Sequence, residues 1–254
     1  MADRLFAGRT ALVTGGSRGI GRAISRMLGA QGARVAVNYV SAEAAAAEVV
    51  AAIERDGAEA LAVQADVSRP GEVDTMIATL TDRFGPVDLL VNNAGMVERG
   101  DHGQLDFAGW KRMFEVNVDG PFLTTWAVKD GMIARGYGRI VNVSSLAAVI
   151  HRSNLIHYST AKSAVVAFTR QCADAFAPHV RVNCLAPGLI DTDMARTANQ
   201  EMVQTLVEHT PLGRIGTPAE MAAAVQFLLS EESSFITGQT LSACGGRTLV
   251  PGPA

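Results

Sequence analysis

Tyr158 and Lys162 stand four residues apart at the start of an apolar stretch that predicts a buried helix. Residues at this spacing share a helix face, so the phenol and the ammonium would lie one turn apart, about 6 Å along the axis. A tyrosine is a weak acid, and a neighbouring cation favours its ionised form. Such a pair can protonate the alkoxide that forms when a hydride adds to a carbonyl. Chance pairs on half-exposed helices show the same spacing, so the pair alone does not decide.

A second candidate for chemistry is the glycine turn near the N-terminus, "VTGGSRGIGRA" at 13–23. Gly15, Gly19 and Gly21 follow the spacing G-x-x-x-G-x-G. Glycine permits positive φ and lets a diphosphate approach the backbone. The start of the next helix offers free N–H groups and a partial positive charge. In its position between a strand and a helix, the turn predicts a dinucleotide site rather than an ordinary loop.

Alternating strands and helices must position these residues. Alternation of this kind predicts an α/β fold with a doubly wound parallel sheet of about seven strands and helices on both faces. Because no linker or repeat interrupts the pattern, 1–254 is predicted as a single dinucleotide-binding and catalytic domain. Strands, some running into turns, are predicted at 10–14, 34–39, 59–66, 87–95, 138–145 and 179–188. Helices are predicted at 21–32, at 41–57 with Ser41 as its cap, and at 68–85 with a polar cap.

Bulk properties exclude several classes of protein. The net charge of −3 over 254 residues provides no attraction for nucleic acid or an anionic membrane. No apolar run reaches the ~18 residues of a membrane span, and the N-terminus lacks the apolar segment of a signal peptide. Cys172, Cys184 and Cys244 are scattered, which indicates a reducing compartment and argues against a zinc site. We expect a cytoplasmic protein without a metal.

Several motifs, taken in order, resemble the short-chain dehydrogenase/reductase family in its short single-domain form. They are "TGGSRGIG" at 14–21, "NNAG" at 92–95, "NV-D-G" at 117–120, "SS" at 144–145, "YSTAK" at 158–162 and "PG" at 187–188. Their order across nearly the whole chain is more specific than any single motif. The resemblance implies an NAD(P)-dependent oxidoreductase acting on CH–OH donors, and within the family the chain is similar to 3-oxoacyl-(acyl-carrier-protein) reductases.

The resemblance also implies a catalytic set made of Asn117, Ser145, Tyr158 and Lys162. Tyr158 would donate the proton, with Lys162 favouring the tyrosinate. Ser145 would bind the substrate oxygen and stabilise its developing charge. Asn117 would hold a water that links Lys162 to solvent. Ser144 competes with Ser145, and the family's spacing to the tyrosine favours Ser145.

The residue at the end of the second strand indicates which cofactor is used. Tyr39 stands where an acid would bind the ribose hydroxyls of NAD, and Arg18 can reach a 2′-phosphate. Asn38 and Ser41 offer further hydrogen bonds. NADP(H) is therefore favoured, with NAD(H) as the alternative. By resemblance, the cofactor is expected to contact Gly15, Ser17, Arg18, Gly19, Ile20, Gly21, Asn38, Tyr39, Ser41, Asp66, Val67, Asn93, Ala94, Gly95, Tyr158, Lys162, Pro187, Gly188 and Thr192.

The substrate is less sharply indicated. A 3-oxoacyl group or another hydrophobic carbonyl is expected, with an apolar wall predicted at Leu146, Ala147, Val149 and Ile150. Carrier-protein reductases tend to carry basic residues where this chain has Gly136 and His179, although Arg135 and Arg181 are near. Cys244 replaces an acid near the C-terminus. His151 and His157 lie beside the tyrosine, where packing or capping competes with a substrate contact.

Three other functions compete with this interpretation. An NAD-dependent degradative alcohol dehydrogenase of the same family differs only at the strand end and in its substrate. A non-catalytic Rossmann sensor is expected to lack one of the four catalytic residues. A sugar-nucleotide epimerase needs a different glycine spacing and a larger C-terminal domain.

The resemblance further implies a homotetramer. Family members pair the helix that here carries Phe122 and Trp126, and the tyrosine helix with Val165 and Phe168, across a two-fold axis. Apolar residues at these positions are consistent with such pairing, although a monomer core would look similar.

Overall fold

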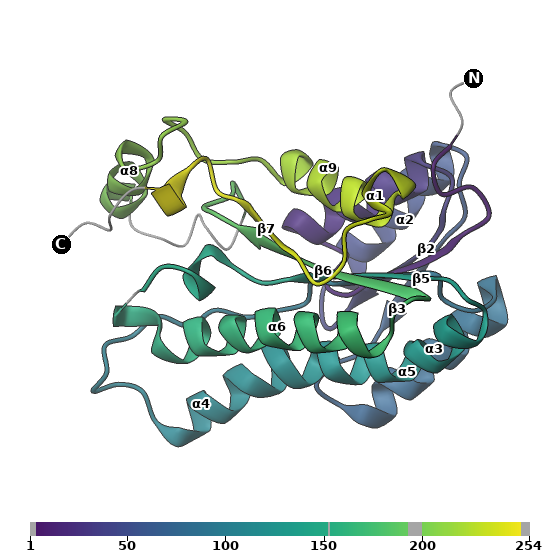
Figure 1. Cartoon of the computed structure of the whole chain (residues 1–254), viewed down its shortest axis with the longest axis horizontal. Helices are drawn as coiled ribbons and strands as arrows, with labels where there is room; N and C mark the ends of the chain where they lie inside the picture. The colour runs from purple at the N-terminus through teal and green to yellow at the C-terminus, as the bar shows by residue number, and fades with distance from the viewer. Residues whose placement is uncertain (1–3, 152, 193–199, 250–254) are drawn as a thin grey trace.

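A parallel sheet of seven strands forms the centre of the protein, in the order β3-β2-β1-β4-β5-β6-β7 (Figure 1). The computed structural model describes residues 4–151, 153–192 and 200–249. The predicted doubly wound α/β fold is confirmed, and the predicted strand over 34–39 is confirmed at both ends. The strands are β1 Thr10–Val13, β2 Arg34–Tyr39, β3 Ala60–Gln64, β4 Leu89–Asn92, β5 Gly138–Val143, β6 Val180–Pro187 and β7 Thr240–Ala243.

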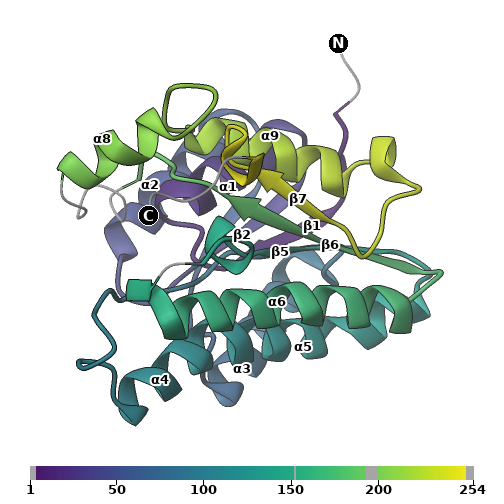
Figure 2. The same ribbon diagram turned by 60° about the vertical axis from the view of Figure 1, so that its left-hand side comes forward.

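Helices cover both faces of the sheet, as Figures 1 and 2 show from two directions. One face packs against α1 (Gly19–Ala30), α2 (Glu43–Arg55) and α9 (Pro218–Leu229). The other packs against α3 (Pro70–Phe84), α5 (Gly120–Ala134) and α6 (Ile156–Ala175). Further helices of the described residues are α4 (Phe107–Phe114), a π-helix (Glu115–Asp119) that joins α4 to α5, and α8 (Gln200–Glu208), together with short 3-10 turns. Within the described ranges, no helix combines the length and the apolarity that crossing a membrane requires.

Two hydrophobic cores result from the alternation of side chains along each strand. In β1, Ala11 and Val13 pack in the core beneath α1, α2 and α9, whereas Leu12 packs in the core on the α3, α5 and α6 face. Successive side chains of a strand point to opposite faces, so a strand buried on both sides must be apolar throughout. The run "TALV" satisfies this requirement, and all four residues are buried.

The strand order reverses beside β1, which pairs with β2 on one side and with β4 on the other. In such sheets the crevice beyond the carboxyl ends of these strands is the ligand site. The turns that follow β1, β4 and β5 all reach this edge.

Two predicted helix caps are wrong. Helix α2 begins at Glu43 without a side-chain cap, and Ser41 lies outside the helix. Helix α3 begins at Pro70, also without a side-chain cap. A proline at the first position presets the helical φ and has no N–H to satisfy. The nearby Ser68 hydroxyl instead donates to the Asp66 carboxylate at 2.7 Å.

Candidate active site

A large cleft of about 940 Å³ lies at the carboxyl edge of the sheet. It is walled by the turns that follow the strands and by the start of α6. Every predicted site residue except Asn38 lines it. They are Gly15, Ser17, Arg18, Gly19, Ile20, Gly21, Tyr39, Ser41, Asp66, Val67, Asn93, Ala94, Gly95, Asn117, Ser145, Tyr158, Lys162, Pro187, Gly188 and Thr192.

The glycine turn provides a cradle for an anion. Gly15 and Gly19 have φ of +60° and +51°, in the region that favours glycine. A Cβ on Gly21 would overlap the carbonyl oxygen of Gly15 and lie 2.6 Å from the Asn93 amide nitrogen. Helix α1 starts directly after the turn, with no side-chain cap and no acid in its first turn. Its N–H groups therefore meet no competing side chain, which fits the diphosphate of a dinucleotide.

Asn38 supports this cradle from behind. It is fully buried, and its side-chain oxygen accepts from the Gly15 N–H at 3.1 Å. Its amide nitrogen donates to the Ala65 carbonyl at 2.9 Å. Because both ends of the amide bind backbone groups, the expected contact of Asn38 with the cofactor does not match this structure.

The turn after β4 is hydrogen-bonded to the glycine turn after β1. The Asn93 amide donates to the carbonyls of Thr14 and Gly15 at 2.9 and 3.1 Å. In return, the Thr14 hydroxyl accepts from the N–H groups of Asn93 and Ala94, both at 3.0 Å. These bonds fix the turn after β4 against the turn after β1, so the floor of the cleft is rigid.

Asp66 lies at the end of β3, at the edge of the cleft. Burial alone would raise the pKa of its carboxyl, but hydrogen bonds from Ser68 and the charge of Arg112 outweigh burial and hold the pKa below its usual value. Arg112 approaches Asp66 to 3.7 Å and Glu115 to 3.8 Å. The acid in the cleft wall is therefore ionised and paired.

Lys162 projects from α6 into the reacting end of the cleft. It is 5% exposed, and its ammonium donates to the Val143 carbonyl at 3.0 Å. Burial disfavours the charged form and lowers the pKa of Lys162 to about 8. Its Nζ lies 5.9 Å from the centre of the Tyr158 ring. The expected one-turn spacing of the two side chains is therefore observed.

The pKa of Tyr158 differs from the sequence-based expectation. Burial raises it above the usual value, while a hydrogen bond with Ser145 and the charge of Arg99 act in the opposite direction. We expected Lys162 to lower this pKa, but desolvation of the phenol is the larger effect in the protein alone. Tyr158 therefore holds its proton at neutral pH.

Asn117 lies in the π-helix between α4 and α5 and is fully buried. Its amide nitrogen donates to the carbonyls of Met96 and Met113 at 3.0 and 3.1 Å, but its Oδ1 has no hydrogen-bond partner. A Cβ on Gly95 would lie 2.8 Å from this oxygen and 3.2 Å from Lys162 Nζ. The glycine thus leaves a gap between the two polar atoms. Because buried polar atoms normally have a partner, either protein or ordered water, a water in this gap would satisfy the oxygen.

The two neighbouring serines after β5 have different partners. The Ser144 hydroxyl donates to the Lys162 carbonyl at 2.7 Å and so ties α6 to the sheet. The Ser145 hydroxyl accepts from the Ala147 N–H at 3.1 Å and hydrogen-bonds Tyr158. Only Ser145 contacts the phenol, as its predicted role requires.

Residues that sequence reasoning missed complete the far end of the cleft. Leu146, Ala147 and Ile150 line it as expected, but Val149 does not. Arg99 follows the "NNAG" turn, and that position was the only available signal. Met96 and Val97 follow the same turn and Leu189 follows the "PG" motif, whereas no motif lies beside Leu206 or Arg247. The added lining residues include Met96, Val97, Arg99, Leu189, Leu206 and Arg247.

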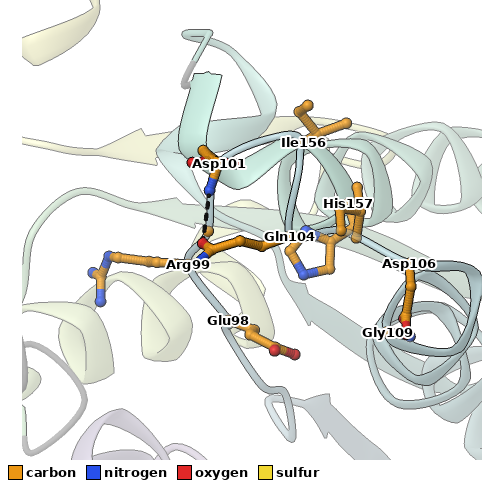
Figure 3. Close-up of a pocket in the computed structure, with 10 residues that line it drawn as sticks. Glu98, Arg99, Asp101, Gln104, Asp106, Gly109, Ile156 and His157 are labelled. Atoms are coloured by element: carbon orange, nitrogen blue, oxygen red, sulfur yellow. Dashed lines mark hydrogen bonds between the residues drawn. The ribbon is translucent and has the colours of Figure 1, made fainter.

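A smaller cavity of about 340 Å³, whose lining residues are drawn in Figure 3, adjoins this end. Arg99 lines both the smaller cavity and the large cleft. His157 faces the smaller cavity and is buried. His151 is exposed and lines neither cavity. Neither histidine therefore lines the large cleft.

The two arginines that could have replaced the basic residues of carrier-protein reductases both bind backbone carbonyls, Arg181 in the interior and Arg135 at the surface. Arg181 is 7% exposed and donates to the carbonyls of Leu228 and Ser230 at the end of α9, at 3.0 and 2.7 Å. Arg135 donates to the Val87 carbonyl at 2.7 Å and lies 3.6 Å from Asp88. Both guanidinium groups cap backbone carbonyls.

Comparisons with known proteins agree with this geometry. A family model described as enoyl-(acyl carrier protein) reductase matches residues 15–248. The chain is 40% identical over 243 residues to a 3-oxoacyl-[acyl-carrier-protein] reductase of Synechocystis, covering 95% of this chain and 97% of that protein.

Two solved structures show the same fold with different cofactors. A gluconate 5-dehydrogenase from Burkholderia cenocepacia in complex with NADP and tartrate has a TM-score of 0.92 and 34% identity, covering 98% of both chains. A 7α-hydroxysteroid dehydrogenase complexed with NADH and 7-oxo glycochenodeoxycholic acid has a TM-score of 0.92 and 32% identity, covering 96% of both chains.

Proposed function

Since the chain belongs to the short-chain dehydrogenase/reductase family, whose members are NAD(P)-dependent oxidoreductases of CH–OH and keto groups, we propose a cofactor and a substrate class for it. The proposed cofactor is NADP(H), and the proposed substrate is a hydrophobic carbonyl compound. One observation carries the proposal. The cleft joins a glycine cradle and Arg18 at one end to Ser145, Tyr158 and Lys162 at the other. The first end suits a phosphorylated dinucleotide, and the second suits the protonation of an alkoxide.

The residues of the reacting end divide the proton chemistry among them. A bound nicotinamide dinucleotide supplies or accepts the hydride. Tyr158 gives its phenol proton to the substrate oxygen as the alcohol forms, and takes it back in the reverse direction. The Ser145 hydroxyl donates a hydrogen bond to the same oxygen. Lys162 stabilises the tyrosinate that remains, and a water between Lys162 and Asn117 returns the proton.

The proposed preference for NADP(H) rests on the end of β2 and on the glycine turn. Tyr39 is the last residue of β2 and is 9% exposed. Because this residue is a tyrosine and not an acid, no carboxylate at the end of β2 repels a 2′-phosphate. Arg18 is exposed and lines the cleft at the start of α1. One charge-assisted contact from arginine to phosphate contributes roughly 1.5–3 kcal/mol, which corresponds to about 10- to 150-fold in the specificity ratio.

Cofactor kinetics test this proposal. We expect kcat/KM with NADPH to exceed that with NADH, measured on the best ketone of a panel. Arg18→Ala should weaken the use of NADPH by about 10- to 150-fold and leave that of NADH nearly unchanged. Tyr39→Asp should shift the preference towards NADH by repelling the phosphate. Equal or better use of NADH by the wild type would contradict the proposal and favour a degradative NAD-dependent alcohol dehydrogenase.

For the substrate we favour a free hydrophobic ketone over one bound to a carrier protein. The apolar side chains of Leu146, Ala147 and Ile150 line the reacting end of the cleft. Arg181 is buried and bound to backbone carbonyls, and the exposed Arg135 donates to the Val87 carbonyl and lies 3.6 Å from Asp88, so both charges already have partners within the chain. A 3-oxoacyl group presented on a small thioester remains compatible with this cleft.

We also propose a homotetramer. Phe122 and Trp126 are 40% and 43% exposed, and their rings stack at 4.3 Å with Phe168 beside them. An apolar surface of this kind on α5 and α6 suits contact with another subunit. Val165, which we expected in the same surface, is 1% exposed and faces the core. Light scattering at micromolar concentration should show a tetramer, and a monomer would refute the assembly.

A cytoplasmic location is proposed from the cysteines. Cys172, Cys184 and Cys244 are all buried free thiols. Such thiols are typical of a reducing compartment.

A further inference from the structure

Most of the charged side chains that line the large cleft are cations. Its acid among the described residues is Asp66, which is paired with Arg112 at the β3 end. Its cations are Arg18, Arg99, Arg112, Lys162 and Arg247. Arg18 belongs to the glycine turn, and Lys162 belongs to the catalytic set. Arg99 has no role in the function proposed so far.

Arg99 is exposed in the loop after β4, four residues beyond Gly95. Its guanidinium forms no ion pair or hydrogen bond with any part of the chain that the structure describes. Acids are nevertheless close, because Glu98, Asp101 and Asp106 line the adjoining small cavity. Figure 3 shows the Arg99 side chain extending away from all three.

Two of these acids are already satisfied by backbone groups. Asp101 accepts from the Gly103 N–H and Asp106 from the Gly109 N–H, both at 2.7 Å. Backbone N–H groups therefore bind these two carboxylates, and Arg99 is directed into the large cleft. An unpaired guanidinium keeps its full set of donors for a planar anion.

Arg99 also acts on the reacting end rather than on the phosphate end. Its positive charge lowers the pKa of Tyr158, against the larger effect of burial. Arg99 and Tyr158 both line the large cleft, so the guanidinium and the phenol that exchanges the proton face one space. Met96, Val97 and Leu146 add apolar surface to the same part of the cleft.

We propose that the preferred substrate is an oxo acid, whose carboxylate binds Arg99 while its ketone meets Tyr158 and its apolar part contacts Leu146 and Ile150. This inference rests on the proposed function and adds the charge of the substrate to it. A carboxylate matches the planar fork of arginine and can bind it with two parallel hydrogen bonds. Arg99 is thus a specificity-determining residue.

A set of matched substrates tests this inference. Straight-chain oxo acids, with the ketone at successive distances from the carboxylate, are each paired with their methyl esters and assayed with NADPH. Wild type should favour the best acid over its ester by about 10- to 100-fold in kcat/KM, mainly through KM. Arg99→Gln should reduce this ratio to near unity, and Arg99→Lys should restore part of it, because lysine keeps the charge but not the planar fork.

Arg83→Gln is the matched control, because it removes an arginine from α3 that does not line the cleft. It should leave the ratio of acid to ester as in wild type. Equal turnover of acid and ester by wild type, or an unchanged ratio in Arg99→Gln, would overturn the role of Arg99 while leaving the proposed function standing. No turnover of either member of any pair would contradict the proposed function itself, and this inference with it.

Discussion

The two ends of the cleft are built from different materials. The cofactor end is made of backbone, held in shape by Thr14, Asn38 and Asn93, whose polar atoms bind main-chain groups. The reacting end is made of side chains from the turn after β5, from α6 and from the π-helix, and it contains a buried cation and an unsatisfied amide oxygen. A backbone site is damaged by adding atoms, whereas a side-chain site is damaged by removing them.

The two ends of the cleft also differ in their effect on the free energy of folding. Polar groups at the cofactor end are buried with their hydrogen bonds made, so their desolvation is offset. Lys162 is buried as an ammonium, and within the described residues its hydrogen-bond partner is the Val143 carbonyl. Burying a charge with so little compensation opposes folding. The buried charge of Lys162 therefore makes the folded protein less stable, as is common at catalytic sites.

Removing one oxygen from the reacting end should have the largest effect. Tyr158→Phe keeps the ring and deletes the proton donor, so kcat/KM should fall by about 10²- to 10⁴-fold. NADPH binding, followed by fluorescence, should remain near the wild-type value because the cofactor end is intact. Turnover within a few-fold of wild type would show that Tyr158 is not the acid.

Adding one carbon to the cofactor end should produce the complementary effect. In Gly21→Ala the new Cβ overlaps the Gly15 carbonyl oxygen, so the cradle must shift. Overpacking of this kind costs roughly 1–3 kcal/mol, so NADPH affinity should fall by about 5- to 150-fold. Gly71→Ala is the control, because a Cβ there meets nothing within 4 Å. Unchanged NADPH affinity in Gly21→Ala would contradict a backbone-built site.

The smallest effect concerns stability and pH. Burial lowers the pKa of Lys162 from 10.5 to about 8. Between these values the unfolded chain binds more protons than the folded one, so wild-type stability should rise as the pH increases from about 8 to 10.5. Below pH 8 the full cost of burying the charge is present.

Lys162→Met removes this cost along with the activity. Allowing about 1 kcal/mol for the lost hydrogen bond to Val143, the variant should be about 2 kcal/mol more stable than wild type at pH 7. Thermal unfolding measured at pH 7 and at pH 10.5 should show the difference at the lower pH, and a much smaller difference at the higher one. A variant less stable than wild type at pH 7 would mean that the ammonium is well compensated.

The sequence predicted those features of the fold that depend on neighbouring residues, and it failed where a side chain could bind more than one partner. The strand over 34–39 was predicted at both ends because an apolar run between polar residues marks it. The caps of α2 and α3 were predicted wrongly, because serine is a common cap but its hydroxyl can bind elsewhere. Ser68 binds Asp66 instead. The Asn38 amide likewise binds backbone groups of the protein, at Gly15 and Ala65, and not the side of the turn that faces the ligand.

The candidate site shows the same division. The glycine turn, which follows β1, and the tyrosine–lysine pair, which lies at the start of α6, line the same cleft. The direction of the pKa shift of Tyr158 was not predicted, because it depends on burial by residues far along the chain. Arg99 was missed because its orientation depends on how its own loop satisfies Asp101 and Asp106.

By itself, the amino-acid sequence determined the parallel sheet, the glycine turn and the tyrosine–lysine pair, because periodicity and short spacing are properties of neighbouring residues. Only the tertiary structure decided which polar side chains serve the backbone and which face the ligand. Asn38 binds Ala65, and Arg181 binds Ser230, while Arg99 is left facing the cleft. The reason is physical: a buried polar group must find a partner, and the partners available are set by contacts between residues that are distant in the chain.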